Sequence, residues 1–303
     1  MLSVVIVNYK NEDLTIRYVK EELVKVHNPH IVVIVNNGAT DASDKELCNG
    51  LNAGLVYDIN DEIDNNLKVF VIHNNENSGF AIGNNLGAKF SSIHFPVEYF
   101  LFSNNDIKLN GDNVIEHLIH KLRSLPDVSI IGPKVIGLDG SLQSPEPYQS
   151  FFKRMIIPYF NFLLTDGFKK NYYQSDYSEK AKEGYHYKVM GSFFIVDKND
   201  FFNCGMMDEN TFLYYEENIL SERIQRIGKN VYYYPLVSVI HAHSQTIGKY
   251  SSFRKQRDYM FSSAAYYYKK YKGTSTFQIA IGYILKELSI IIGAFKRKFV
   301  HKY

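Results

Sequence analysis

The sequence predicts an α/β fold in which a Rossmann-like, mostly parallel sheet carries helices on both faces. Two observations predict it. Short apolar runs rich in β-branched and aromatic residues alternate with helical patterns over the first 125 residues, and their spacing of about thirty residues is typical of βαβ units. Each run is also apolar on both of its faces, as strands covered on both sides of a sheet must be.

The elements follow in a regular order through the first half of the chain. The expected strands are residues 2–8, 31–37, 67–74 and 98–104, with helices at 14–26 and 113–125. No pattern is clear from 140 to 188. Order then resumes with a strand within 188–201, a helix at 216–228 closed by Gly228, strands on either side of Pro235, and helices at 254–271 and 277–299.

Charge is divided unevenly along the chain. The net charge is +2, but the segment 249–303 holds twelve Lys and Arg residues against two acids, a balance of +10, so the rest carries −8. Such a basic end indicates an anionic partner, for example phosphates or lipid head groups. The sequence contains no nucleic-acid recognition module, so nucleic acid is not an expected partner.

Polar residues collect where the expected strands end. In open α/β sheets the carboxyl ends of the strands form the edge at which ligands bind. We therefore expect a binding site at this edge. Its candidate residues are Asn8, Tyr9, Asn36, Asn37, Asn104, Asn105 and Asp106.

Asp106 is the first candidate for chemistry. A carboxylate at the end of a buried strand suits a hard divalent cation such as Mn²⁺ or Mg²⁺, which prefers oxygen ligands and leaves room for substrate phosphates. A carboxylate that caps the next turn is the alternative. His241 and His243 share one face of an expected strand. One of them, with His241 preferred, is expected to be a second metal ligand, although a core histidine is the commoner case.

The stretch NENSGFAIGNNLG, residues 75–87, surrounds an expected helix start. Free backbone amides at such a start attract phosphate, and glycine lets a ligand or a neighbouring backbone approach closely. A tightly packed turn between strand and helix explains the same glycines equally well. The candidate binding residues here are Asn77, Gly79, Gly83 and Asn84.

Glu216 and Glu217 lie at the start of a predicted helix. Successive helical residues diverge by about 100°, so the two side chains cannot face the same way. One is expected to point into a cleft as a general base while the other caps the helix or pairs, for example with Arg223. A solvated acidic first turn that favours the helix dipole is the alternative. The residues before this helix suggest an acceptor-binding wall that includes Asp208, Glu209 and Tyr215, with core packing as the alternative for the aromatics.

Taken together, these motifs resemble the family 2 glycosyltransferases in order and spacing, and in particular the rhamnosyltransferase-like branch that builds bacterial surface polysaccharides. The resemblance covers about residues 2–270. It is carried by VNY at 7–9, VNNGATD at 35–41, the N-x-G-F-x-x-G-N-N-x-G pattern at 77–87, NND at 104–106, a G-x-F-x-V-like stretch at 191–196, a D-E-x-F-F-x-Y-x-E-D-like stretch at 208–217 and the histidine at 241.

The resemblance implies a GT-A fold. Residues 1–250 would form the glycosyltransferase domain, with a nucleotide-sugar part to about 135 and an acceptor part over 136–250, followed by a helical extension at 251–303. It also implies inversion at the anomeric carbon, with Glu217 as catalytic base. Val7 and Gly191 join the residues expected to bind the donor, and Glu216 joins those expected to bind the acceptor. The implied partners are a UDP- or dTDP-sugar and a saccharide or lipid-linked saccharide.

Four positions depart from the family pattern, among them Asn105 in place of a proline and Glu217 in place of an aspartate. Asn36 stands where the family has an aspartate that contacts the nucleotide base, so the hydrogen-bonding groups offered to a base differ. Ile219 replaces a later acid of the family motif. A sugar-nucleotide-binding protein without transfer activity is therefore an alternative. A nucleotidyltransferase is another, although VNYKNED is a poor substitute for the glycine-rich, basic loop that such enzymes use.

The segment from Phe277 to Val300 is apolar nearly all round, with Lys286 and Glu287 in its middle. Two adjacent charges argue against a transmembrane helix. An interfacial helix with a cationic end, lying on the inner leaflet, is one expectation. A helix packed against the domain or in a homodimer is the other. Because the first residues read as a strand and not as a signal peptide, we expect a cytoplasmic protein, peripheral on the membrane if the first expectation holds.

Overall fold

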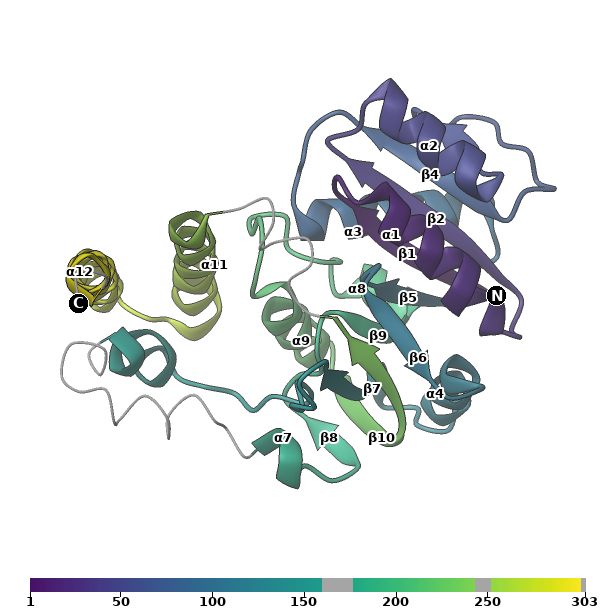
Figure 1. Cartoon of the computed structure of the whole chain (residues 1–303). Helices are drawn as coiled ribbons and strands as arrows, with labels where there is room; N and C mark the ends of the chain where they lie inside the picture. Colours follow the sequence, from purple (N-terminus) through teal and green to yellow (C-terminus); the bar gives the residue numbers. More distant parts are fainter. Residues whose placement is uncertain (160–176, 243–251, 301–303) are drawn as a thin grey trace.

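The chain is described by a computed structural model over residues 1–159, 177–242 and 252–300. Its centre is a ten-stranded sheet with the order β3-β4-β2-β1-β5-β9-β7-β10-β6, and β8 pairs with β10 outside this path (Figure 1). The strands are β1 (Leu2–Asn8), β2 (His30–Asn37), β3 (Gly54–Val56), β4 (Val69–Asn74), β5 (Tyr99–Ser103), β6 (Ile107–Asn110), β7 (Val128–Gly137), β8 (Gly184–His186), β9 (Phe193–Asp197) and β10 (Asn230–His241). The predicted α/β fold class is confirmed.

The first half of the sheet is parallel and the second half is mixed. β1 runs parallel to β2 and β5, and β2 runs parallel to β4, so the carboxyl ends of these strands meet at one edge. β9 lies antiparallel between β5 and β7, and β10 pairs antiparallel with β6. The expected boundary between the nucleotide-sugar part and the acceptor part, at about residue 135, falls within β7, and the sheet is continuous there.

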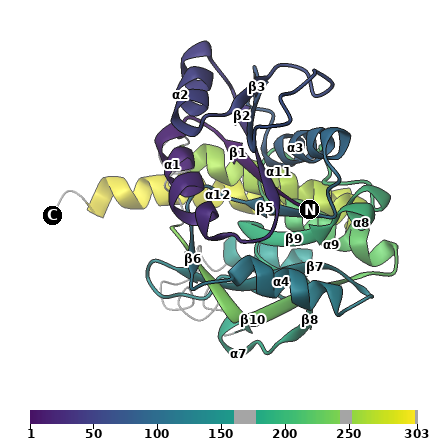
Figure 2. The ribbon, with the colours of Figure 1, turned by 90° about the vertical axis from the view of Figure 1, so that its right-hand side faces the viewer.

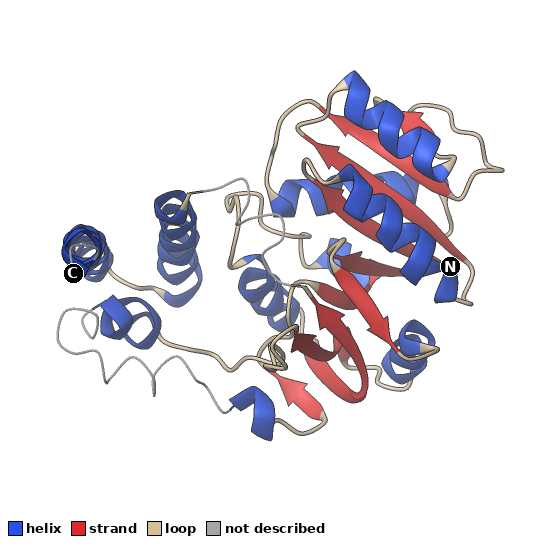
Figure 3. Cartoon of the chain, viewed as in Figure 1, coloured by secondary structure: helices blue, strands red, loops and turns tan. Residues whose placement is uncertain are grey.

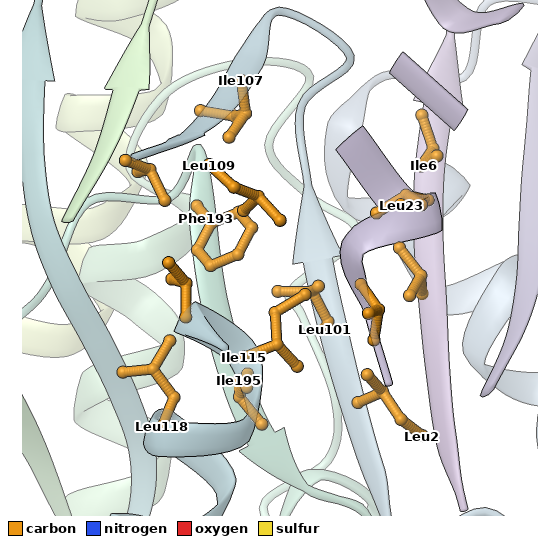
Figure 4. Packing of buried hydrophobic residues seen from close by; sticks show 14 of the residues in the cluster. Leu2, Ile6, Leu23, Leu101, Ile107, Leu109, Ile115, Leu118, Phe193 and Ile195 are labelled. Carbon is orange, nitrogen blue, oxygen red and sulfur yellow. The ribbon is translucent and has the colours of Figure 1, made fainter. Parts of the chain in front are cut away.

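Helices cover both faces of this sheet, as predicted (Figure 3). Those of the domain are α1 (Glu12–Arg17), α2 (Asp41–Leu51), α3 (Phe80–His94), α4 (Val114–Arg123), α7 (Tyr177–Lys180), α8 (Lys198–Asn203) and α9 (Glu216–Arg226). Side chains of α1, α2 and α4 contribute to a core cluster on one face, and those of α3, α8 and α9 to a cluster on the other. On the first face, Ile115 and Leu118 of α4 pack beside Leu101 and Phe193 (Figure 4).

The C-terminal extension forms two long helices, α11 (Phe253–Lys272) and α12 (Thr276–Val300). A separate, largely aromatic cluster holds α11 to α9 and to the π-helical turn η3 (Phe152–Ile156). α12 packs on α11 and η3 and is the outermost element of the molecule in Figure 1. Its C-terminal part projects beyond the rest of the chain (Figure 2).

The structure differs from the sequence-based expectation in several elements, and the short strands β3, β6 and β8 are not among the expected ones. The expected helix at 14–26 is α1 followed by a π-helical turn and a 3-10 turn (η1, Tyr18–Glu22; η2, Leu23–Lys25). The strands expected around Pro235 are the single strand β10, with a register shift between Tyr234 and Ser238. The central strand β7 was not predicted at all. It contains Gly132 and Pro133, which resemble a turn, but a Cβ at Gly132 would lie 2.7 Å from Val189 Cβ, so the glycine is needed for packing.

Candidate active site

A buried amide network joins the ends of β1 and β2. Asn8 and Asn36 are register partners and are 0% and 1% exposed. Asn8 Nδ2 donates to Asn36 Oδ1 at 2.9 Å, and Asn36 Nδ2 donates to Ser43 Oγ and Asp44 Oδ1, both at 2.8 Å. Both amide protons of Asn36 are thus engaged within the protein. These two residues lie buried beneath the candidate site. A hydrogen bond from the Asn36 amide to a nucleotide base would require one of its two present bonds to break.

A second network ties the end of β2 to the loop before α3. Asn74 Nδ2 donates to Asn37 Oδ1 at 2.7 Å, and Asn37 Nδ2 donates to the Gly79 carbonyl at 3.0 Å. Asn77 Oδ1 accepts from the Gly79 amide. Tyr9 is half-buried at the end of β1. The strand ends and the 75–87 motif therefore meet, as expected, through side-chain amides.

The glycines of the 75–87 motif serve close packing. Gly79 has φ +89°, and a Cβ there would lie 2.4 Å from the Phe212 carbonyl oxygen, which accepts from the Phe80 amide at 3.0 Å. A Cβ at Gly83 would lie 2.9 Å from Val7 Cγ2. Asn84 is buried and donates to the Phe80 carbonyl. The first amide of α3 is therefore used by the 208–215 loop, which supports the packing interpretation of this motif over a free phosphate cradle.

Antiparallel pairing of β6 with β10 brings Asp106 and His241 together. Asp106 precedes β6, and its carbonyl accepts from the Ala242 amide at 3.0 Å. His241 Nε2 lies 3.4 Å from Asp106 Oδ1, and the two side chains are 3% and 8% exposed. His241 Nδ1 contacts Gln143 Oε1 at 2.7 Å. The predicted pair of ligands is thus adjacent in space, 135 residues apart in sequence. His243 lies outside the described residues.

The Asp106 and His241 side chains fit a divalent cation. Asp106 Oδ1 is buried and has no hydrogen-bond partner among the residues that the structure describes. Gln143 Oε1 can only accept, which favours a proton on His241 Nδ1 and makes Nε2 an acceptor beside the carboxylate, where Asn104 Nδ2 also lies at 3.5 Å. Two facing acceptors favour a cation between them. The described residues hold no cluster of three or more His, Cys, Asp or Glu, so further ligands would come from substrate phosphates and water, as is usual for Mg²⁺.

Glu217 lies in the first turn of α9, beside the loop before β9, and its side chain is 22% exposed. Its Oε1 accepts from Lys188 Nζ at 2.9 Å, and Lys188 also lies 3.4 Å from Glu146. A Cβ at Gly191 would lie 3.5 Å from the Glu217 carboxyl, so glycine leaves this carboxyl room. Burial by itself would raise the pKa of Glu217, but the Lys188 ammonium outweighs it and holds that pKa below its usual value. Glu217 is therefore ionised at neutral pH, as a general base must be.

Glu216 has the opposite environment. It is 3% exposed, and its Oε1 has no hydrogen-bond partner within the described part of the chain. Burial, reinforced by the adjacent Glu217 charge, raises the pKa of Glu216 to about 8. This carboxyl is neutral at pH 7 and points into the protein. The expected divergence of the two side chains is confirmed, but the suggested pairing with Arg223 is wrong, because Arg223 pairs with Asp208.

Asp208 holds helices together. It is 1% exposed, and Oδ2 accepts from the hydroxyls of Tyr266 and Tyr271 at 2.9 and 2.6 Å and lies 2.9 Å from Arg223 Nη2. Burial alone would raise the pKa of Asp208, but hydrogen bonds donated by Asn210 and the two tyrosines reverse this and lower it. A carboxylate enclosed in this way has no free oxygen for an acceptor. We therefore leave Asp208 out of the acceptor contacts that we propose.

The other expected acceptor residues divide between core and surface. Tyr215 is 6% exposed and packs in the aromatic cluster against Tyr267 and Tyr268. Glu209 has a side chain that is 48% exposed and accepts from Asn85 Nδ2 at 3.0 Å. Of the residues expected on the acceptor side, Glu209 is thus the one with an accessible carboxylate, while Tyr215 and Glu216 face inward.

Contacts between loops connect the Asp106 region with Glu217. The Asn104 amide donates to the Ser192 carbonyl at 2.8 Å, and Ser192 follows Gly191, which adjoins Glu217. Asn104 Nδ2 lies 3.5 Å from His241 Nε2. Asn105 is buried, and its Nδ2 donates to Thr15 Oγ1 of α1, so it holds the turn between β5 and β6 to α1. The candidate metal ligands and the candidate base therefore lie near one edge of the sheet: Asp106 between β5 and β6, His241 at the end of β10, and Glu217 in the first turn of α9 beside Gly191.

Sequence analysis missed three residues that support these groups. Gln143 orients His241, and Lys188 and Glu146 hold Glu217. All lie in the stretch 140–188, where no periodic pattern exists to place them. Their types gave no signal either, since lone Gln, Lys and Glu residues are common on any surface.

The chain was compared with known proteins and structures. A family model described as glycosyl transferase family 2 matches residues 3–178, more than half of the chain. The low-salt glycan biosynthesis hexosyltransferase Agl10 of Haloferax volcanii is 24% identical over 243 residues, covering 79% of this chain and 66% of that protein. The match thus spans just under two thirds of that relative's length.

Two solved structures share the fold. The mannosyltransferase PcManGT from Pyrobaculum calidifontis, in complex with GDP-Man and Mn²⁺, has a TM-score of 0.56 at 12% identity, covering 97% of this chain and 74% of that one. GalNAc-T7 with UDP, GalNAc and Mn²⁺ has a TM-score of 0.51 at 16% identity, with coverages of 80% and 44%. The predicted GT-A fold is thereby confirmed. Together with the family match, it identifies this chain as a member of glycosyl transferase family 2.

Proposed function

We propose that this chain is a metal-dependent, inverting glycosyltransferase that moves a hexosyl unit, of which rhamnosyl is one candidate, from a nucleotide-diphosphate sugar to a saccharide or lipid-linked saccharide. One observation carries the proposal: Asp106, with a buried oxygen that lacks a partner in the described chain, lies in a turn that is hydrogen-bonded to the Gly191–Ser192 loop, and this loop adjoins the ionised Glu217 of α9. Family membership supports the reaction class, and the GDP-Man, UDP and Mn²⁺ of the two similar structures support the donor class and the cation.

The proposed reaction is a single displacement. The acceptor hydroxyl oxygen forms a bond to the anomeric carbon as the bond from that carbon to the phosphate oxygen breaks, and the nucleotide diphosphate leaves with the electron pair. Glu217 takes the hydroxyl proton. Lys188 keeps Glu217 ionised before the attack and stabilises its orientation. Bound Mn²⁺ or Mg²⁺, held by Asp106 and His241, would neutralise charge on the departing diphosphate.

The finer assignments follow from the same reasoning. A UDP- or dTDP-sugar is the donor that we propose, although both amide protons of Asn36 are engaged and a base would have to compete for them. Donor contacts would come from Val7 and Tyr9 at the end of β1, and Glu209 would face the acceptor. We place the reaction in bacterial surface polysaccharide synthesis, on the cytoplasmic face of the membrane, where lipid-linked acceptors are available.

Glu217→Gln tests the proposed base. The substitution keeps the shape of the side chain but removes its basicity, so acceptor-stimulated release of nucleotide diphosphate should fall by about 10²- to 10⁴-fold. The measurement is product release from UDP- and dTDP-sugars with Mn²⁺ or Mg²⁺, and Glu62→Gln, at an exposed position outside the candidate site, serves as the matched control. Full activity of Glu217→Gln would remove this residue from the mechanism. Pyrophosphate production or binding without turnover by the unaltered chain would indicate nucleotidyl transfer or a binding protein.

A further inference from the structure

Helix α12 has its polar side turned inward. Lys286 has a side chain only 3% exposed, with Nζ 2.6 Å from Asp258 Oδ1 of α11 and 2.7 Å from Glu287 Oε1. Glu287 in turn pairs with Arg254 of α11 at 3.1 Å. The two charges that interrupt the apolar segment in the sequence are thus both consumed at the contact between the helices. Lys286 and Glu287 therefore do not prevent the outward side of α12 from contacting an apolar environment.

The outward side of α12 is apolar. Apart from Tyr283, its exposed large apolar side chains lie four or three residues apart along the helix, the spacing of one helical face. At a rise of about 1.5 Å per residue this stripe is about 21 Å long. No charged side chain is exposed between residues 276 and 292, the part of α12 whose side chains the structure describes. The exposed large apolar residues are Phe277, Ile281, Tyr283, Ile284, Leu288 and Ile291, with exposed fractions from 38% to 75%.

This face needs an apolar partner, because contiguous exposed apolar patches mark interaction surfaces. None of the helices that the structure describes is long and apolar enough to cross a bilayer. A partner that fits is therefore one against which a helix lies lengthwise: the surface of a lipid bilayer, or a second copy of the same helix.

Charge favours the bilayer. The segment 249–303 carries a balance of +10, so two copies brought together here would repel, whereas anionic head groups would be attracted. Arg254, whose side chain is 61% exposed, lies beside the stripe through its contact with Glu287. The area of the face also favours the bilayer. The face measures about 21 Å by 10 Å, or roughly 210 Å², which is far below the roughly 800 Å² that each partner buries in a standard protein interface.

We propose that α12 is a bilayer-contacting helix, which lies in the plane of an anionic lipid surface with the Phe277–Ile291 stripe in the acyl boundary and basic residues of the extension at the head groups. The proposal stands independently of transferase activity. It gives the extension a function that the family's catalytic motifs do not require.

Vesicle flotation of the full chain tests this proposal. The unaltered chain should float with vesicles of phosphatidylcholine and phosphatidylglycerol, and less with phosphatidylcholine alone. Ile284→Asp with Leu288→Asp should lower the bound fraction at least about tenfold, because two apolar side chains would then have to carry charge into the lipid. Val24→Asp with Leu236→Asp is the matched control, since these side chains are 67% and 73% exposed elsewhere on the surface. The control should float like the unaltered chain.

Two further measurements complete the test: the molecular mass of each protein in solution and the rate of sugar transfer to a soluble acceptor. Both double variants should keep the transfer rate of the unaltered chain, since neither touches the candidate site, so loss of vesicle binding and loss of activity are separate results. The proposal is overturned if the unaltered chain fails to float, or if both double variants float equally. A dimer that Ile284→Asp with Leu288→Asp splits, without any vesicle binding, would assign the face to a second copy.

Discussion

At the scale of single residues, position within a helix decides what a carboxylate can do. Glu216 and Glu217 are neighbours in sequence, yet one is buried without a counter-charge and the other faces Lys188. The pKa of Glu216 is raised to about 8 and that of Glu217 is lowered. The two acids are therefore a neutral buried carboxyl and an ionised carboxylate, a difference set by environment alone.

Lys188→Met should shift the acid limb of the pH–rate profile to higher pH. The ammonium lowers the pKa of Glu217, so its loss raises that pKa, and a base works only above its pKa. Each unit of rise costs about tenfold in the ionised fraction on the acid side. The measurement is nucleotide diphosphate release against pH. Lys188→Arg should restore the original limb, and an unmoved limb in Lys188→Met would show that Lys188 does not control the base.

Asp106→Asn should remove the Mn²⁺-dependent part of donor binding. A ligand at a hundred times its Kd stabilises the folded state by about 2.7 kcal/mol, so UDP with Mn²⁺ should raise the melting temperature of the unaltered chain above the value with UDP alone. The variant should show no such increment. Asp112→Asn, at an exposed neighbouring position, is the control. An equal Mn²⁺ effect in Asp106→Asn would exclude this residue as a ligand.

At the scale of elements, the turn before α3 joins two distant parts of the chain. Gly79 lies against Phe212, and Asn85 of α3 accepts from the Met207 amide and donates to its carbonyl. The 75–87 motif therefore fixes the loop that leads to Glu217. Its effect on catalysis would act through that loop, in addition to any contact with the donor.

Gly79→Ala should destabilise the fold by more than Gly228→Ala. Both glycines have positive φ, which costs an alanine about 1 kcal/mol, but a Cβ at Gly79 would meet the Phe212 carbonyl at 2.4 Å and one at Gly228 has nothing within 4 Å. Crowding should add about 1 to 3 kcal/mol at Gly79. Urea unfolding measures both. Equal losses of stability in the two variants would mean that the loop around Phe212 moves aside without cost and does not depend on its contact with Gly79.

At the scale of the whole molecule, the extension and the domain share one buried ionic centre. Asp208 of the domain contacts Tyr266, Lys270 and Tyr271 of α11 and Arg223 of α9. Asp208 thus ties the loop before α9 to α11, on which α12 packs. Binding of α12 to a bilayer would thus orient the whole sheet relative to the membrane.

Asp208→Asn should lower the free energy of unfolding at neutral pH by about 2 to 4 kcal/mol. The substitution removes the negative charge that Arg223 and the hydroxyls of Tyr266 and Tyr271 contact. The folded-state pKa of Asp208 is lowered, so its stabilisation is present above the unfolded pKa of about 3.9 and is lost as pH falls through the folded value. The difference between the two proteins should therefore shrink in acid. Glu209→Gln, at an exposed carboxylate, should change stability by less than about 1 kcal/mol.

Periodicity and strand-end chemistry predicted much of this protein from its sequence. The parallel strands β1, β2, β4 and β5 and the long C-terminal helices follow from patterns that act locally or repeat. Asp106 and His241 were expected together from ligand chemistry and the family resemblance, but their contact depends on the pairing of β6 with β10. The strand β7 did not, because Gly132 and Pro133 look like a turn and only Val189 reveals why the glycine is there. Gln143 and Lys188 were also missed, since their roles exist only through partners far away in the chain.

By itself, the sequence determined the fold class, the family and the set of polar residues at the strand ends, because these depend on hydrophobic period and on motifs of fixed spacing. The tertiary structure decided which member of each polar pair is free to act. It enclosed Asp208 and Glu216, left Glu217 partly exposed beside Lys188, and turned Lys286 inward so that α12 shows an apolar face. Burial and counter-charge depend on groups brought from distant parts of the chain, and a residue's own neighbours in sequence do not contain that information.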